Sequence, residues 1–137
     1  MKQVDELIRG ELAAIKSFDA VLPKIKDTNE KQKLSEMRMD HVKAVDSLKR
    51  FVRNFDEKNV DTAGPWGAFA TAFAGGASFF GDKVSIKALK MGEEHGIQEY
   101  REAIEDGSID PNLKRVIQTE LLPQQQQHLS VINGYLQ

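Results

Sequence analysis

LKMGEEHGIQEYREA, residues 89–103, has the pattern of an amphipathic helix with a carboxylate inside its apolar stripe. Residues on this stripe recur every three or four positions, the spacing that places side chains on one helix face. The face comprises Ile86, Leu89, Glu93, Gly96, Tyr100 and Ala103. An unpaired buried carboxylate costs several kcal/mol, so Glu93 must be hydrogen-bonded, neutralised or bound to a metal ion. The pattern therefore predicts a polar partner for Glu93 inside the fold.

Helical spacing of apolar residues recurs along the rest of the chain and predicts an all-α fold. The expected helices span residues 2–27, 30–58, 82–106 and 111–136. Turn and capping residues between the first two helices, and again between the last two, are close enough to make two helical hairpins. The chain has 137 residues, which is enough for one domain made of these four helices.

A long connection, residues 59–81, separates the two hairpins. Its part TAGPWGAFATAFAGGASFFG, residues 62–81, carries no charge and is long enough to raise the question of a membrane span. It contains five glycines and one proline but no Leu, Ile or Val, so both its transfer energy and its helix propensity are poor. We expect instead a crossover along a four-helix bundle, with a short helix at about residues 66–74.

Composition excludes several classes of function. The 19 Lys and Arg residues nearly balance the 21 Asp and Glu residues, so neither nucleic acid nor an anionic membrane is an expected partner. The absence of cysteine excludes disulfides, thiolate metal sites and cysteine nucleophiles. The charged start, MKQVDELIRGEL, has no apolar signal-peptide core, and we expect a cytoplasmic protein. No phosphate-binding loop or nucleophile elbow is present in the sequence.

The two hairpins are related by an internal repeat. LIRGELAAIKSF, residues 7–18, aligns with LKMGEEHGIQEY, residues 89–100, and places Glu11 over Glu93. Each following helix carries a histidine on its apolar stripe, His41 in the first hairpin and His128 in the second. The repeat predicts a pseudo-two-fold bundle in which these four polar residues converge on the axis.

One difficulty concerns the height of the two histidines. Counted from the hairpin turns, His41 and His128 differ by about seven residues, or roughly 10 Å along a helix. Loop length, a kink at Pro123 or a helix bulge would have to absorb this difference.

At these residues the chain resembles the ferritin-like superfamily, and within it a bacterial family known mainly as a domain of unknown function. The motifs that carry the resemblance are Gly-Glu on the first and third helices, GPWG in the crossover, and GEE-x5-Y-x-EA at residues 92–103. The resemblance implies a ferritin-like bundle. In active members it also implies a carboxylate-bridged di-iron centre, with Glu on helices one and three and Glu-x-x-His on helices two and four.

The metal ligands implied by this resemblance are only partly present. Those that match are Glu11, His41, Glu93 and His128. The second glutamate of each Glu-x-x-His motif is replaced, by Arg38 and by Gln125. A di-metal site needs bridging carboxylates, so di-iron oxidase or ferroxidase chemistry does not follow. Two carboxylates and two imidazoles do suit a single divalent ion of iron, manganese or zinc.

Two functional hypotheses remain open. The first is a ferritin-like protein that binds a metal ion through the Glu/His layer. In the second, the layer is a structural hydrogen-bond network that fixes helix register, and the protein is a non-catalytic interaction or scaffold protein. Its partner would meet the aromatic crossover or a face of the bundle, and a second copy of the chain is one such partner. A solvent-filled or ligand pocket at the layer is a third interpretation.

Overall fold

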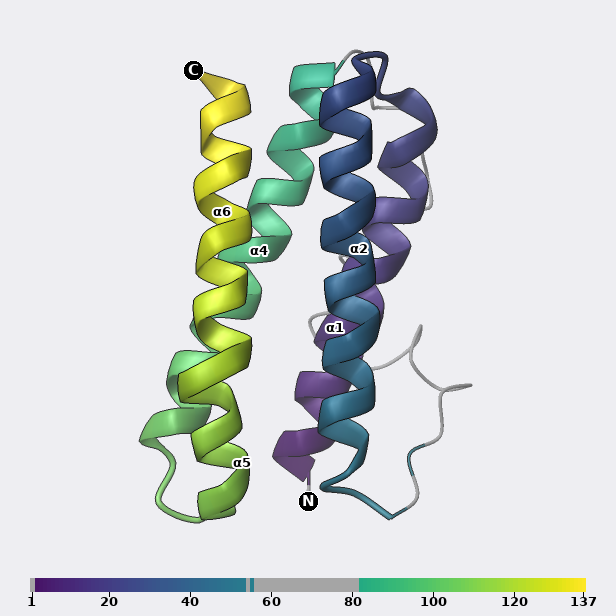
Figure 1. Ribbon diagram of the computed structural model, residues 1–137. Helices are drawn as coiled ribbons and strands as arrows, with labels where there is room; N and C mark the ends of the chain where they lie inside the picture. The colour runs from purple at the N-terminus through teal and green to yellow at the C-terminus, as the bar shows by residue number, and fades with distance from the viewer. Residues whose placement is uncertain (1, 54, 56–81) are drawn as a thin grey trace.

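Figure 1 shows a computed structural model of the chain, in which residues 2–53, 55 and 82–137 are described. Every regular element in these residues is helical, which confirms the all-α class for this part of the chain. The helices are α1 (Lys2–Val21), α2 (Thr28–Lys49), α4 (Asp82–Glu105), α5 (Pro111–Val116) and α6 (Leu122–Leu136). The expected crossover, residues 59–81, and its short helix at 66–74 lie outside the described residues.

The long helices run side by side, with α1 packed against both α2 and α4, and α4 packed against α6. Apolar side chains form two core clusters, one around Ile8 and Leu48 and the other around Phe18 and Leu34. On every long helix the buried Glu, His and Gln side chains fall between the two clusters. These residues are Glu11, His41, Glu93, Gln125 and His128. The polar layer is therefore enclosed by apolar packing on both sides.

Capping residues start the second helix of each hairpin as expected. The side chain of Asp27 accepts a hydrogen bond from the Glu30 amide at 3.0 Å, and Asp110 accepts one from the Asn112 amide at 2.7 Å. Pro111 occupies the first turn of α5, where the amide hydrogen that proline lacks is not needed. Each cap satisfies an otherwise orphaned amide of the helix start.

The first helix ends earlier than its apolar pattern indicates. It was expected to reach residue 27, but α1 ends at Val21 and is followed by a 3₁₀ turn, Leu22–Lys24. Pro23 explains the difference, because proline lacks the amide hydrogen that would continue the α-helical bonding.

The second helix also ends early, at Lys49 rather than near residue 58. Amides of Phe51 and Val52 bond to carbonyls only three residues back, at 3.0 and 3.3 Å, so the chain tightens into a turn there. Residues 54 and 56–58 of the expected helix lie outside the described part of the chain.

A π-helical turn, Ile117–Leu121, joins α5 to α6. The amide of Leu122 bonds to the carbonyl of Ile117, five residues back. The buried residues Leu113, Ile117, Leu121 and Gln125 are spaced by four. Over the twelve steps from the first to the last of these residues, an α-helix turns roughly 120° more than three full turns. The one extra residue in the π turn compensates roughly 100° of this excess. The π turn thus keeps both ends of this long helical segment facing the core.

No helix in the described ranges 2–53 and 82–137 is long and apolar enough to cross a membrane. The uncharged segment 62–81 lies outside those ranges.

Gly96 allows α6 to lie close to α4. A Cβ atom at this position would stand 2.0 Å from Nε2 of Gln125, whose amide donates to the Glu93 carbonyl at 3.4 Å. We expect Gly96→Ala to lower the free energy of unfolding by about 1 kcal/mol, because the displaced buried amide loses its acceptor. In a Gln125→Ala background, the same substitution should instead raise stability by about 1 kcal/mol, the helix-propensity gain of alanine over glycine.

Urea denaturation of the four proteins of this cycle measures both values. An equal effect of Gly96→Ala in the two backgrounds would show that Gln125 is not what the new methyl group meets.

Candidate metal centre

His41, on α2, lies between two carboxylates from neighbouring helices. Its Nδ1 is 2.6 Å from Oε2 of Glu11 on α1, and its Nε2 is 2.6 Å from Oε1 of Glu93 on α4. The three side chains are only 3%, 5% and 2% exposed, respectively. The polar partner expected for Glu93 is therefore His41, which ties α2 to both α1 and α4.

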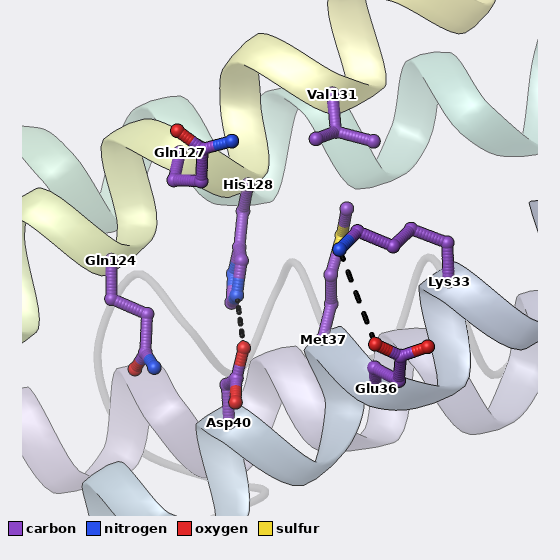
Figure 2. A pocket seen from close by; sticks show the side chains of 8 residues that line it. All are labelled: Lys33, Glu36, Met37, Asp40, Gln124, Gln127, His128 and Val131. Atoms are coloured by element: carbon purple, nitrogen blue, oxygen red, sulfur yellow. Dashed lines mark hydrogen bonds and ion pairs between the residues drawn. The ribbon is translucent and has the colours of Figure 1, made fainter.

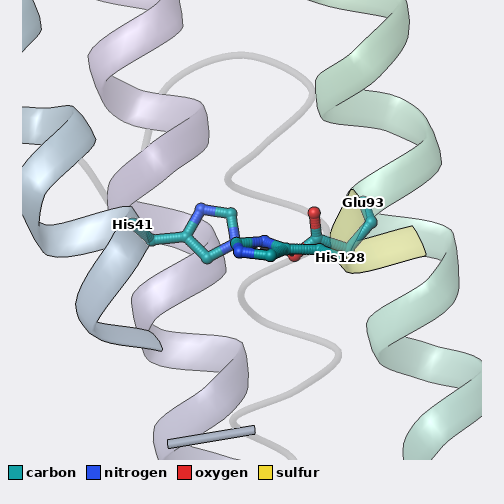
Figure 3. A group of neighbouring side chains, drawn as sticks. All are labelled: His41, Glu93 and His128. Atoms are coloured by element: carbon teal, nitrogen blue, oxygen red, sulfur yellow. Dashed lines mark hydrogen bonds and ion pairs between the residues drawn. The ribbon is translucent and has the colours of Figure 1, made fainter. Parts of the chain in front are cut away.

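His128, on α6, approaches the same glutamate from another side. Its Nδ1 is 3.5 Å from Oε1 of Glu93, and its ring is 5.1 Å from the ring of His41, centroid to centroid, in a T-shaped arrangement. Figure 3 shows the His41 side chain reaching from α2 toward the side chains of His128 and Glu93, which come from two other helices. One nitrogen of each histidine and one oxygen of Glu93 all lie within 4.8 Å of one another.

The height difference inferred for the two histidines does not exist in the structure. The turn that follows α1 and the turn that follows α4 lie at opposite ends of the molecule (Figure 1). The residue counts from each turn to its histidine therefore start at opposite ends of the molecule and cannot be compared with each other. The hairpins run in opposite directions, and this brings His41 and His128 together.

Glu11 lies behind His41 and is not one of the three converging residues. Its Oε2 meets Nδ1 of His41, the ring nitrogen that faces away from Glu93, and its Oε1 accepts a hydrogen bond from the Tyr100 hydroxyl at 2.6 Å. Three of the four expected ligands, His41, Glu93 and His128, are thus brought together. The fourth instead orients His41, and the Tyr100 ring, expected in the core, is part of this arrangement.

Arg38 and Gln125, which replace the implied second glutamates, do not contribute carboxylates to the centre. Arg38 is turned outward, with Nε 2.6 Å from Oδ1 of Asp19. Gln125 is buried and donates to the backbone carbonyl of Glu93. His95, expected to be exposed because it lies on another face of the helix, is exposed.

Asp40 was not identified from the sequence, yet it completes the arrangement. Its Oδ2 is 2.8 Å from Nε2 of His128. It therefore stands behind His128 as Glu11 stands behind His41. The signal in the sequence is weak, because Asp40 merely precedes a core-facing histidine and one helical step of 100° leaves it at the edge of that face.

Burial and charge set the protonation of the metal-free cluster. Burial by itself lowers the pKa of His41, but the nearby Glu93 and Glu11 carboxylates outweigh it and raise this pKa well above the ordinary 6.5. Burial by itself raises the pKa of Glu93, but His41 and His128 bring it down to about 2. The pKa of Tyr100 is raised well above 10.0 by burial and by Glu11. Without metal, His41 is therefore an imidazolium between two carboxylates.

The backing carboxylates also determine which nitrogens are available to a metal ion. Both ring nitrogens of His41 face a carboxylate at 2.6 Å, so if Nε2 were given to an ion, Glu11 could hold the remaining proton on Nδ1. For His128, Asp40 holds the proton on Nε2, which leaves the Nδ1 lone pair facing Glu93. This carboxylate–histidine pattern is typical of metal sites.

Two atoms of the centre have unused bonding capacity. Glu93 Oε2 and His128 Nδ1 are buried and have no hydrogen-bond partner among the described residues. Buried polar atoms are nearly always paired, so two orphans in one place require an explanation. A bound cation would satisfy both.

Comparison with known protein families matches residues 1–106 to the family described as Domain of unknown function (DUF2383). The matched residues include Glu11, Asp40, His41 and Glu93, and the match ends before the helix that carries His128. Neither the curated proteins nor the solved structures give a significant match. The match covers well over half of the 137 residues of the chain. The chain therefore belongs to the DUF2383 family, whose function is unknown.

Proposed function

We propose that this protein binds one divalent metal ion through Nε2 of His41, Nδ1 of His128 and the carboxylate of Glu93. The observation that carries the proposal is the convergence of three buried ligand atoms within 4.8 Å. Two imidazoles and one carboxylate are a donor set used for zinc, iron and manganese. These are the three metals expected from the sequence.

The distances indicate how an ion would be accommodated. Two ligands at 2.0–2.1 Å from a tetrahedral ion are about 3.4 Å apart, and His128 Nδ1 lies 3.5 Å from Glu93 Oε1. The separation of 2.6 Å between His41 Nε2 and Glu93 Oε1 is instead that of a hydrogen bond. The ion therefore takes the place of the proton between them, and binding releases that proton to solvent.

A ferritin-like bundle is the arrangement we propose for the whole chain. Its support is the pair of oppositely directed hairpins and the long connection between them, together with the motifs of the resemblance. The ion is proposed to be single, because Arg38 pairs with Asp19 and Gln125 carries no charge. A cytoplasmic location and assembly with further copies of the chain remain proposals from the sequence.

The alternative is a structural layer in a scaffold or interaction protein. The short bond between His41 and Glu93 favours it, because His41 already has a carboxylate on each ring nitrogen. In that case the layer fixes the relative position of α1, α2 and α4, and folding is independent of metal.

Metal titration of chelator-treated protein by calorimetry, with elemental analysis of the product, distinguishes the two. We expect about one equivalent of Zn²⁺, Mn²⁺ or Fe²⁺, and release of about one proton, measured by repeating the titration in buffers of different ionisation enthalpy. Glu93→Gln and His128→Ala should each abolish stoichiometric binding. His95→Ala is the matched control, because this histidine is exposed on the same helix as Glu93.

Circular dichroism of each variant confirms that it is folded. A folded wild-type protein that stays empty at excess metal would reject the metal proposal and leave the structural layer.

A further inference from the structure

A polar pocket of about 320 Å³ opens between α2 and α6 (Figure 2). Its polar lining consists of Lys33, Glu36, Asp40, Gln124, Gln127 and His128. At about 30 Å³ per water molecule, the pocket has room for roughly ten waters. It is therefore large enough for a divalent ion together with its inner hydration shell.

The pocket adjoins the proposed metal centre through His128. The Nε2 of this ring meets Asp40 at the pocket, while its Nδ1 lies 3.5 Å from Glu93 in the core. The Asp40 side chain is 32% exposed, whereas those of His128 and Glu93 are 5% and 2% exposed. Within the described residues, the hydrogen-bonded cluster thus meets solvent at Asp40, with one imidazole between the pocket and the core.

A second cavity, on the other side of the cluster, is too small for a hydrated ion. It measures about 10 Å³ and is lined by Glu11, Gly96 and Tyr100 among others. This volume is close to the minimum for one water molecule.

We propose that the pocket between α2 and α6 is the route by which the divalent ion enters and leaves the centre, an inference that rests on the proposed metal binding. The carboxylates of Glu36 and Asp40 and the amide oxygens of Gln124 and Gln127 are hard oxygen donors. Carboxylate and amide oxygens are ligands that hydrated divalent ions accept beside their remaining waters. The ion then passes His128, which is itself a ligand.

The charges at the pocket predict opposite effects on the rate. Nζ of Lys33 lies 4.0 Å from Oε1 of Glu36, and both side chains are about half exposed. Because a like charge repels the approaching ion, Lys33→Gln should raise the association rate, and Glu36→Gln should lower it. Each change should be about two-fold at low ionic strength and should vanish at high salt.

Stopped-flow measurements test the route directly. Mixing apoprotein with Zn²⁺ gives the association rate, and mixing the Zn²⁺-bound protein with a chromophoric chelator gives the dissociation rate. Gln127→Trp fills the pocket, and we expect it to slow association and dissociation by the same factor, tenfold or more, with an unchanged Kd. A blocked path raises the barrier without altering either end state. Gln126→Trp is the control, because this exposed neighbour on α6 is not among the pocket residues.

Other results would overturn the route. Unchanged rates in Gln127→Trp, with Zn²⁺ still bound at the wild-type Kd, mean that the ion uses another path. A changed Kd with an unchanged association rate means that the pocket residue acts on the centre itself. Wild-type protein that binds none of Zn²⁺, Mn²⁺ and Fe²⁺ defeats the proposed function, and the route falls with it. If Gln127→Trp does not fold, Gln124→Phe is judged by the same criteria. The two charge variants then decide by whether their association rates change in the opposite directions expected.

Discussion

Replacing His41 with leucine is expected to lower the free energy of unfolding of the metal-free protein by about 3–5 kcal/mol. This is the usual cost of removing one partner of a buried ion pair. Glu11 would keep only the Tyr100 hydroxyl, and Glu93 would keep only His128, whose Nδ1 is 3.5 Å away. Both carboxylates would be left in the core without their shared cation.

The cost should come from the stranded charges rather than from lost packing. We therefore expect most of the stability to return when Glu11→Met, Glu93→Met and Tyr100→Phe are added to His41→Leu. An apolar set of similar volume is often as stable as the buried ionic set it replaces. The Tyr100 hydroxyl is removed because its acceptor, Glu11, would be gone.

Urea denaturation with a chelator, near pH 6 and followed by circular dichroism, measures these values. The control is His95→Leu, since this exposed histidine on α4 should change stability by less than about 0.5 kcal/mol. A loss below about 1 kcal/mol in His41→Leu would mean that His41 is not the shared cation of the two carboxylates.

Stability of the metal-free protein should be greatest between about pH 4.5 and 6.5. The folded pKa of Glu93, about 2, lies below its ordinary 4.5, so its contribution is present above pH 4.5 and is lost as the pH falls toward 2. The folded pKa of His41 lies well above 6.5, so its contribution is present below pH 6.5 and is lost as the pH rises through the folded value.

The stability lost at acid pH, which we call the acid limb of the profile, has a definite size. A pKa that falls from 4.5 to about 2 corresponds to roughly 3 kcal/mol of stability. Urea midpoints measured from pH 2 to 9 in chelator should show this loss in wild-type protein. Glu93→Gln has no carboxylate to protonate there, so its acid limb should be shallower. A wild-type profile that is flat from pH 6 to 3 would contradict the ion pair.

Bound metal should reverse the alkaline side of this profile. Coordination requires neutral imidazoles, and each released proton tightens apparent binding about tenfold per pH unit while that group is still protonated. With saturating Zn²⁺, the free energy of unfolding should therefore rise from pH 5 to 7.5. Over the same pH range, the metal-free protein in chelator should gain no stability. Coincident profiles with and without Zn²⁺ would argue for the structural layer.

Much of the architecture could be predicted from the sequence, because it depends on local chemistry. Helical periodicity located the long helices, and Asp27 and Asp110 marked two helix starts. The inward direction of His41 and His128 followed from the same periodicity. Pro23 was the local signal that went unused, and it accounts for the early end of α1.

The details of the centre were less accessible, because they depend on how helices are placed relative to one another. Periodicity assigns a side chain to a face, but it does not specify which ring nitrogen meets which carboxylate. Glu11 therefore appeared equivalent to Glu93, although it contacts the opposite nitrogen of His41. Asp40 was missed for the same reason, since its partner is on a helix 88 residues away in the chain.

The polar contacts of the centre largely join the two halves of the chain. His41 to Glu93, His128 to Asp40 and Tyr100 to Glu11 each connect one residue before position 55 with one after position 82. Neither half alone contains the three proposed ligands. An ion held there would act as a clamp between the halves, and its free energy of binding would oppose their separation. The supply of metal would then determine how long the protein stays folded, in addition to whether its site is occupied.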